Sequence, residues 1–327
     1  MKRRSFVFAT SATTLSTALV VRLALGRTGK QPRRVGLLGT VGTPSASAKT
    51  LQAVRDGLRE RGHIEGRDIV IDVRYAARPE EFPRLAAELA ALKPSVIIVY
   101  GPAATYAALA ADPEVPIVAM GGDFVETGFA ADLGRPGGRV TGVAILGSPL
   151  NAKRLELLAE LLPKGSAVLN LAEPSARDGP MQLVEVAGRS LGLEMHASYA
   201  RTPAEIDAAF AAARKLRVAG INVLTSPFLH ANRARIIEHA ARAKLPAVYQ
   251  WSQSAEDGGL LAYGPRRVPM DLQLADFASR ILNGAKPADL PIEQPTLFEL
   301  VVNLKTAKAL GITIPQAVLL RADWVIE

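Results

Sequence analysis

The stretch VIIVYGPAATYAALAADPEVPIVA, residues 96–119, decides the fold. It begins with a continuous apolar run at 96–99 and ends with another at 116–119, and an alanine-rich helical segment at 103–111 separates the two. A strand that is apolar along its whole length is typical of a parallel sheet that is covered on both faces. The stretch therefore predicts a β-α-β unit of an α/β protein.

The same alternation extends from this unit toward both termini. On the N-terminal side, apolar runs at 35–38 and 69–73 predict strands, and helical periodicity follows each of them, at 51–58 and 79–92. On the C-terminal side, residues 140–143 predict a further strand. Strands and helices in strict alternation indicate a doubly wound parallel sheet.

The pattern begins again after about residue 145. Further strands are predicted at 167–171, 194–199, 220–224 and 246–249. The helices predicted in this half lie at 151–162, 182–191, 203–216 and 231–243, and Thr202 is the expected cap of the third. Two β/α runs of similar length predict two lobes, with a first hinge crossing near residues 143–148.

The tail of the chain must return to one lobe or the other. It contains a strand at 259–263, a helix at 270–283, a proline-rich stretch at 287–295 and a strand at 298–302. We expect an N-terminal lobe of residues 33–145 with about 263–290, and a C-terminal lobe of 146–262 with about 291–327. The sequence leaves the lobe that holds 291–327 open.

The composition excludes several classes of protein. A length of 327 residues favours two domains, and 49% hydrophobic with 21% charged residues is a globular balance. The aromatic content of 5% suits helix-rich α/β packing better than an all-β sandwich. Cysteine is absent, which excludes disulfides, thiolate metal sites, a cysteine nucleophile and a lipid-modified N-terminal cysteine.

The first 26 residues have the order of an export signal. Lys2, Arg3 and Arg4 precede an apolar stretch at 6–21, and a small-x-small pattern at 24–26 resembles a cleavage site. The stretch is too short for a membrane-spanning helix. We expect a mature protein that is soluble and periplasmic and has no lipid anchor, and the sequence does not distinguish general secretion from twin-arginine export.

The positive charge does not indicate nucleic-acid binding. The formal net charge of +8 falls to +4 without the four basic residues of 1–26. Most of the other basic residues alternate with acids, as in Arg55-Asp56 and in the Arg-Glu-Arg run at 59–61. This mixing is typical of solvated helix faces rather than of a groove that follows phosphates.

Motifs for catalysis, cofactors and metals are missing. The glycines at 36, 39 and 42 do not have dinucleotide-binding spacing, and the sequence contains no P-loop and no nucleophile elbow. The four histidines are scattered, and we interpret them as surface or capping residues: His63, His196, His230 and His239. The sequence therefore predicts no enzyme activity, no cofactor and no metal site.

Loops at the carboxyl ends of the strands are the expected binding positions. Residues 100–104 offer free backbone N–H groups that suit a carboxylate, or they form an ordinary turn. Asp123 either contacts an ammonium or hydroxyl group of the ligand or caps the next helix. The rings of Tyr249 and Trp251 either hold a ligand or pack at the interface between the lobes. The candidate ligand-binding residues are Thr40, Thr43, Tyr100, Gly101, Ala103, Ala104, Asp123, Glu173, Thr225, Ser226, Tyr249 and Trp251.

Four segments carry a family resemblance. Residues 57–69 resemble the pattern GLxxxGYxEGxNI, residues 136–142 resemble RPGGNVTG, and residues 255–264 resemble GGLxSYG. The match is strongest over residues 284–311. These patterns belong to a bacterial ABC-transporter substrate-binding family that contains the tryptophan/tyrosine-type binding proteins, and the similarity covers nearly all of residues 33–327.

The resemblance implies a periplasmic-binding-protein fold of type I. Such a fold has two Rossmann-like lobes with parallel sheets, three chain crossings and a ligand clamped between the lobes. The resemblance further implies a monomer that delivers a small molecule to a membrane permease with its own ATPase. Members with known ligands take aromatic amino acids, so the implied ligand is of amino-acid or aromatic-acid type.

Two departures from the family pattern concern the ligand's ammonium group. The family's GDPV reads GDFV at 122–125, so Asp123 is retained. The aspartate that precedes the family's PFF is replaced by Ser226. Because a buried ammonium needs a paired charge, Asp123 or Glu173 would have to substitute.

Three other functions are compatible with the fold pattern. A ligand sensor that feeds a sensor kinase would share the binding fold, and neighbouring permease and ATPase genes would argue against it. A sugar-type repressor would need an N-terminal helix-turn-helix, where this chain has a signal-like segment. An α/β enzyme such as an amino-acid racemase would need a positioned acid/base pair.

Overall fold

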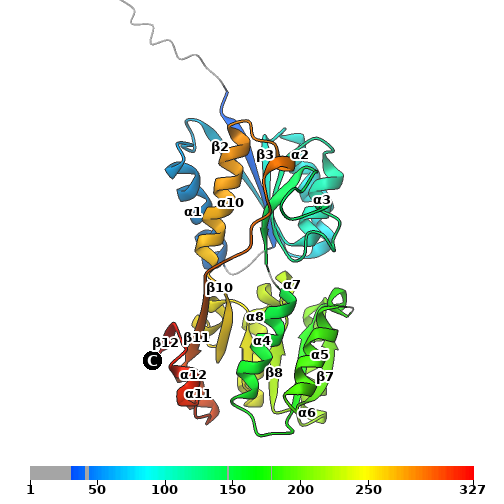
Figure 1. Cartoon of the computed structure of the whole chain (residues 1–327), viewed down its shortest axis with the longest axis vertical. Helices are drawn as coiled ribbons and strands as arrows, with labels where there is room; N and C mark the ends of the chain where they lie inside the picture. Colours follow the sequence, from blue (N-terminus) through cyan, green and yellow to red (C-terminus); the bar gives the residue numbers. More distant parts are fainter. Residues whose placement is uncertain (1–30, 41–43, 146, 178) are drawn as a thin grey trace, which may run out of the picture. The chain divides into compact units, whose positions relative to one another are not determined.

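The computed structural model describes residues 31–40, 44–145, 147–177 and 179–327, which Figure 1 draws in colour. Residues Pro32–Glu327 form one compact unit. The expected signal segment at 1–26 and the candidate Thr43 lie outside the described residues. Within the described ranges, no helix combines the length and the apolar character that crossing a membrane requires.

The first sheet is parallel throughout and comes from the first half of the chain. Its strands are β1 (Arg33–Thr40), β2 (Ile69–Ala76), β3 (Val96–Tyr100), β4 (Ile117–Gly121) and β5 (Val140–Ala144). Their spatial order is β2-β1-β3-β4-β5, and each neighbouring pair runs parallel. This is the doubly wound arrangement in which the chain changes direction beside its first strand.

Helices cover both faces of the first sheet. Side chains alternate along β1 and β3, so that Val35 and Ile98 face one layer while Leu38 and Ile97 face the other. The first layer consists of α1 (Pro44–Glu60) and α10 (Arg267–Leu282), which pack against each other (Figure 1). The second layer consists of the 3-10 turn η1 (Pro79–Glu81), α2 (Phe82–Ala91) and α3 (Pro102–Ala111).

The second sheet has one antiparallel pair, β10–β11, and its other neighbouring pairs are parallel. Its strands are β6 (Ala167–Ala172), β7 (Glu194–Tyr199), β8 (Gly220–Val223), β9 (Ala247–Tyr249), β10 (Leu261–Pro265), β11 (Phe298–Asn303) and β12 (Trp324–Ile326). Their order is β12-β11-β10-β9-β8-β6-β7, and only β11 runs antiparallel to its neighbour β10. β11 is antiparallel to β10 because the chain leaves the second lobe after β10 and enters it again from the side of the first lobe.

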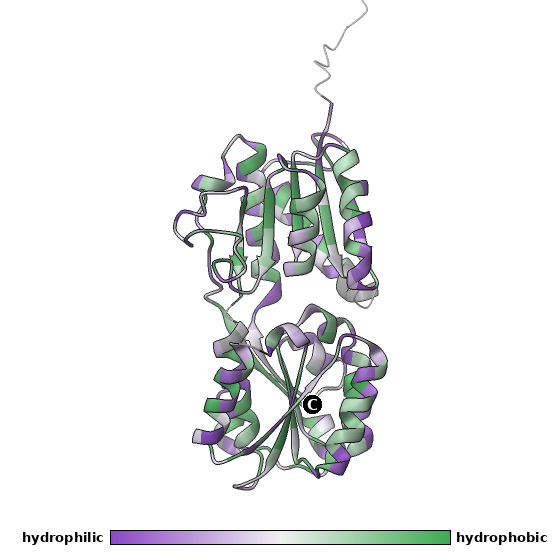
Figure 2. Cartoon of the chain, turned by 90° about the vertical axis from the view of Figure 1, so that its right-hand side faces the viewer, coloured by the Kyte–Doolittle hydropathy of each residue, from purple (hydrophilic) through white to green (hydrophobic). Residues whose placement is uncertain are grey.

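Two helical layers also enclose the second sheet. One layer holds α4 (Gly147–Ala159), α5 (Pro180–Ser190), α11 (Leu304–Leu310) and α12 (Gln316–Leu319). The other holds α6 (Pro203–Lys215), α7 (Pro227–Ala231), α8 (Arg233–Ala243) and α9 (Ser252–Glu256). Short 3-10 turns lie at η2 (Pro174–Ala176) and η3 (Pro287–Asp289). Figure 2 shows the apolar strands inside and the hydrophilic stripes on the outer helix faces.

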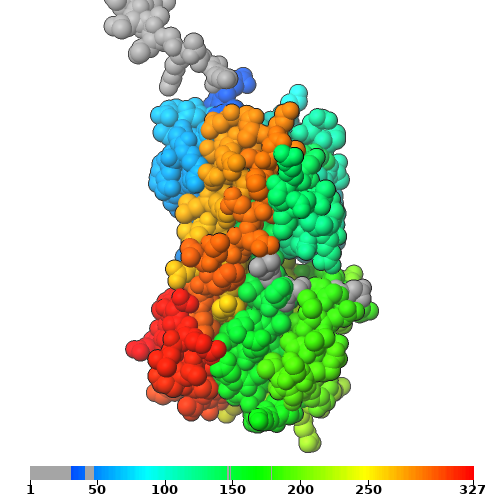
Figure 3. All heavy atoms as spheres, viewed as in Figure 1, coloured from blue at the N-terminus to red at the C-terminus, as the bar shows by residue number. Residues whose placement is uncertain are grey.

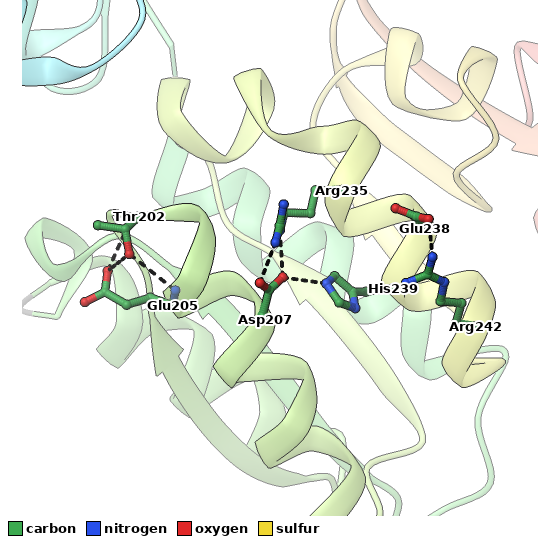
Figure 4. A network of polar contacts seen from close by, with 7 residues as sticks. All are labelled: Thr202, Glu205, Asp207, Arg235, Glu238, His239 and Arg242. Carbon is green, nitrogen blue, oxygen red and sulfur yellow. Dashed lines mark hydrogen bonds and ion pairs between the residues drawn. The ribbon is translucent and has the colours of Figure 1, made fainter.

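Side-chain contacts fix α6 and α8 at the surface. Thr202 caps α6 as predicted, and its hydroxyl and the Glu205 carboxylate form a reciprocal capping box. Asp207 on α6 accepts hydrogen bonds from Arg235 and pairs with His239 on α8 (Figure 4). His239 is therefore a surface residue of this ion-pair network.

Within the described residues the chain passes between the lobes at three places. It leaves the first sheet after β5, returns between Pro265 and Arg267, and leaves again between Glu293 and Phe298. Glu293 still belongs beside β5, because its N–H donates to Gly142 O at 2.9 Å. Residues 263–265 thus lie in the second sheet and 291–293 beside the first, a few residues from the expected boundaries. The C-terminal residues, red in Figure 3, cover one side of the second lobe.

Candidate functional site

A cavity of about 250 Å³ is lined by both lobes at the carboxyl ends of their strands. This volume is near the lower end of the range of about 300–1,000 Å³ that small-molecule pockets occupy. Parallel strands place their following loops at one edge of the sheet, and the cavity lies where two such edges meet. The polar and aromatic lining residues are Thr40, Thr50, Tyr75, Tyr100, Glu173, Ser175, Thr225, Ser226, His230, Gln250, Trp251 and Arg267.

Seven of the candidate residues line this cavity. Each of them ends a strand or follows one within three residues, where a binding edge is expected. The first lobe contributes residues after β1 and β3, and the second contributes residues after β6, β8 and β9. The seven are Thr40, Tyr100, Gly101, Glu173, Thr225, Ser226 and Trp251.

The structure does not bring four other candidates to the cavity. Ala104 and Tyr249 are packed in the cores of their lobes, and Ala103 is exposed on α3. Asp123 is exposed, and its Oδ1 accepts hydrogen bonds from the backbone N–H groups of Val125 at 2.8 Å and Glu126 at 3.0 Å. Asp123 therefore caps the turn that follows it. The alternative role that the sequence allowed was a cap of the next helix, but residues 124–128 form a turn instead.

Arg267 is a cavity residue that the sequence did not indicate. It begins α10 directly after a crossing between the lobes. Its guanidinium lies 5.0 Å from the ring centre of Tyr100 and 5.2 Å from that of Trp251, so it joins aromatic rings of both lobes. Its Nε donates to both carboxylate oxygens of Asp271, at 3.1 and 3.2 Å.

Arg267 and Asp271 stabilise each other's charged form against the cost of burial. Burial alone would lower the pKa of Arg267, but the charge of Asp271 and the hydrogen bonds with Asp271 and Tyr100 raise it. Burial raises the pKa of Asp271, and the Arg267 charge opposes this shift. The Tyr100 hydroxyl also donates to Asp271 Oδ1 at 3.1 Å. The pair thus holds both the guanidinium and the Tyr100 ring in the cavity wall.

Glu173 places a carboxylate on the cavity wall. It follows β6 and accepts a hydrogen bond from the Ser226 hydroxyl, which in turn caps α7 by accepting from Leu229 N at 3.0 Å. Burial raises the pKa of Glu173, although the Ser226 bond and the charge of Arg201 act in the opposite direction. The structure therefore puts a partly desolvated carboxylate next to Ser226, the position where the family pattern has aspartate.

His230 and Gln250 complete the wall beside Trp251. Burial and the charges of Arg233 and Arg267 hold the pKa of His230 well below its ordinary value, so the ring is neutral at pH 7. Gln250 is 7% exposed, and its Nε2 has no hydrogen-bond partner among the described residues. Gln250 directly follows a predicted strand, whereas the sequence indicated His230 as a surface or capping residue. The structure instead places His230 on α7, with its ring 6.1 Å from that of Trp251. In the described ranges, no three His, Cys, Asp or Glu side chains are grouped to hold a metal ion.

Comparisons with known proteins are consistent over nearly the whole described chain. The family model described as ABC transporter substrate binding protein matches residues 34–326. A Tyrosine-binding protein of Clostridioides difficile (strain R20291) is 24% identical over 289 residues, which are 86% of this chain and 81% of that protein.

Two solved structures are similar in fold. A conserved domain protein from Vibrio cholerae has a TM-score of 0.83 at 26% identity, over 90% of this chain and 100% of that one. An ABC domain in complex with L-Trp from Streptococcus pneumonia has a TM-score of 0.81 at 23% identity, over the same shares. Both comparisons support two α/β lobes of the periplasmic-binding-protein type.

Proposed function

The chain belongs to the family of ABC transporter substrate-binding proteins, and from this premise we propose that it captures an aromatic amino acid for a membrane permease. The observation that carries the proposal is the cavity itself. Its walls combine a carboxylate, a helix N-terminus and a cluster of aromatic rings from both lobes. An aromatic amino acid has the complementary groups: an ammonium, a carboxylate and a ring.

The ammonium group fits the Glu173–Ser226 corner. The Glu173 carboxylate supplies the charge that a buried ammonium needs, and the Ser226 hydroxyl fixes its orientation. Glu173 thereby substitutes for the aspartate that the family pattern has at the position of Ser226.

The ligand carboxylate fits the opposite wall. Gly101 and Pro102 line the cavity at the start of α3, a helix of ten residues. Pro102 has no N–H and Gly101 N donates to Met120 O at 2.7 Å, so the N–H groups of Ala103 and Ala104, which lack intrahelical partners, are the donors at this helix end. Gly101 has φ of +90°, a conformation that a residue with a Cβ adopts only with strain, and its position beside Pro227 leaves no room for a side chain. The lobes thus approach each other closely where the head group would lie.

The ring fits the aromatic end of the cavity. Trp251 comes from the second lobe, and Tyr75 and Tyr100 come from the first. Aromatic side chains bury large apolar areas and prefer offset or edge-on contacts with other rings. A ligand ring placed among them would contact both lobes at once.

The mechanism is closure of the lobes rather than bond chemistry. A ligand that contacts both walls stabilises the closed arrangement relative to the open one by its differential affinity. The permease would then recognise the closed form. We propose that the protein acts outside the cytoplasm as a monomer after loss of residues 1–26, and mass spectrometry of periplasmic protein with an intact Met1 would contradict that part.

Calorimetry with L-tryptophan, L-tyrosine and L-phenylalanine tests the ligand class. We expect saturable binding of at least one of them, and a rise in thermal stability at excess ligand, since ligand at a hundred times its Kd stabilises by about 2.7 kcal/mol. L-alanine, which has the same head group without a ring, is the matched control and should bind far more weakly. Absence of binding by all three aromatic amino acids would overturn the proposal.

A further inference from the structure

Arg154 is a fully buried arginine next to the cavity. It lies on α4 with 0% of its surface exposed. Its Nη1 donates to the carbonyl of Tyr263 at 3.1 Å, and its Nη2 donates to Thr225 Oγ1 at 2.8 Å and to Asn151 Oδ1. Its Nε is buried and has no hydrogen-bond partner among the described residues.

The charge of Arg154 is not balanced by an acid within the described part of the chain. Two other arginines near the cavity are paired: Arg233 with Asp257 at 2.8 Å and Arg267 with Asp271 at 3.1 Å. Arg154 contacts only neutral oxygens, and burial lowers its pKa to about 9, so it is still charged at neutral pH. A buried ion without a counter-charge is costly and calls for an explanation.

Thr225 connects this charge to the cavity. Thr225 lines the cavity, and its hydroxyl accepts from Arg154, so its single proton is left to donate. In the structure it donates to Asn151 Oδ1 at 3.2 Å, and it could donate to a ligand instead. Asn151 Oδ1 also accepts from Thr225 N at 2.9 Å, which fixes the backbone at this point. The Thr225 side chain therefore lies between the Arg154 guanidinium and the cavity in which a ligand would bind.

We propose that Arg154 is a positioning residue that makes the cavity selective for an anionic head group. Arg154 orients the Thr225 hydroxyl as a donor toward the cavity, and the ligand's carboxylate provides the counter-charge that the protein lacks. Glu173 does not provide it, because the hydrogen bonds of Arg154 go to Tyr263, Asn151 and Thr225, and the Glu173 charge pairs with the ligand ammonium in the proposed function. The inference rests on the proposed function and requires that the ligand carboxylate, placed at the start of α3, also lies within reach of Thr225. The two segments are close together, because a Cβ at Gly101 would be 2.9 Å from Pro227 Cγ.

The test compares an acid with its amide. L-tryptophan and L-tryptophanamide share the ring and the ammonium and differ in the charge of the head group. The wild-type protein should prefer the acid, and Arg154→Gln should weaken acid binding by roughly ten- to a hundredfold while changing amide binding little. Arg154→Lys, which keeps the charge, should retain part of the preference for the acid.

Two further variants separate this role from folding. Lys153→Gln removes the same charge from the neighbouring, exposed position of α4 and should leave both affinities unchanged. Thr225→Val removes the hydroxyl but keeps the side-chain volume. It should also lower the ratio of the affinity for the acid to the affinity for the amide. If Arg154→Gln does not fold, Thr225→Val decides the matter alone.

The outcomes distinguish the two proposals. If the wild type binds none of L-tryptophan, L-tyrosine and L-phenylalanine, the proposed ligand class is wrong. If it binds L-tyrosine or L-phenylalanine instead, that amino acid and its amide replace the tryptophan pair. If the wild type binds L-tryptophan and the variants lose acid and amide binding equally, Arg154 and Thr225 only maintain the structure and the inference is wrong. An unchanged acid-over-amide ratio in both Arg154→Gln and Thr225→Val would also overturn it.

Discussion

Glu173 determines how the cavity responds to pH at the level of a single residue. Its pKa is raised by burial, so its carboxylate becomes neutral as the pH falls toward a value above the ordinary 4.5. A neutral Glu173 no longer attracts an ammonium. L-tryptophan binding should therefore be constant near neutral pH and weaken on acidification through the raised pKa, as calorimetry across this range can measure.

The matched experiment changes Glu173 to Gln. Glu173→Gln should weaken L-tryptophan binding by about tenfold or more, and the remaining affinity should lose the acid-side pH dependence. Indole-3-propionate, which lacks the ammonium, is the control ligand and should bind both proteins with similar affinity. A variant that keeps the wild-type pH profile would remove Glu173 from the ammonium site.

At the residue scale, the sequence predicts position along the chain better than side-chain direction. Tyr100, Thr225 and Trp251 lie at or just beyond strand ends, where the rule for α/β sheets places ligands, and all three line the cavity; their binding role stays a prediction. The rule does not give side-chain direction: Tyr249 still belongs to β9 and points into the core, whereas Trp251 lies beyond the strand and reaches the cavity. Arg267 was missed because it follows a crossing rather than a strand that ends at the cavity edge.

At the scale of elements, the sequence predicts the long strands and helices and the short buried strand β9, but it does not reveal several other short elements. The predicted strand at 194–199 and the helix capped by Thr202 are observed with the same start residues. Periodicity has too few residues to reveal α7, α9 and β12, which are three to five residues long. Their presence depends on tertiary packing against the second sheet.

Gly142 permits the edge strand β5 to pair with β4. It lies in β5 with φ of +139°, and a Cβ built there would be 1.9 Å from the carbonyl oxygen of Ala119 in β4. Gly142→Ala should therefore displace β5 and lower the free energy of unfolding by more than about 3 kcal/mol. Urea denaturation of the variant measures this loss.

Gly62 is the matched control for this substitution. Its φ of +86° is also positive, but the position that a Cβ would take has no neighbouring atom within 4 Å, so Gly62→Ala incurs only the backbone strain. We expect it to cost about 1 kcal/mol. Equal losses for the two variants would mean that the β4–β5 contact is not what requires glycine.

At the scale of the whole molecule, buried histidines should make stability depend on pH. Burial and the Arg33 charge lower the pKa of His63, which is 5% exposed and lies 3.0 Å from Ser279 Oγ. The unfolded chain has the ordinary value of about 6.5 and binds the proton more readily. The stability contribution is therefore complete above about pH 6.5 and is lost as the pH falls through the lower folded pKa.

His63→Gln isolates this contribution. Glutamine keeps a hydrogen-bonding group near Ser279 but does not titrate, so the variant should lose less stability than the wild type between about pH 7 and 5.5. Urea denaturation at several pH values gives the comparison. An equal loss of stability in the wild type and the variant would assign the pH dependence to other groups, and His230 would be the next residue to test.

The closure of the two lobes that we propose requires both of them, and so it belongs to the scale of the whole chain. Contacts between the lobes include the approach of Arg267 to Trp251 and an ion pair between Lys49 and Glu256 at 3.6 Å, and both lie near the binding edges. The ion pair is solvent-exposed at Lys49 and worth little, so the ligand must supply most of the free energy that holds the lobes together. We expect L-tryptophan to shift the population toward a compact form.

Because the chain lacks cysteine, two introduced cysteines can report closure without background labelling. Lys93→Cys in the first lobe and Lys215→Cys in the second place one spin label on each. Saturating L-tryptophan should narrow the distance distribution between the labels, and the radius of gyration from small-angle scattering should fall with it. The same labels in Arg154→Gln should require a higher ligand concentration for the same narrowing, because closure is driven only by contacts that the bound ligand makes with both lobes. Ligand binding that leaves the distance distribution unchanged would show that this protein receives its ligand without closing.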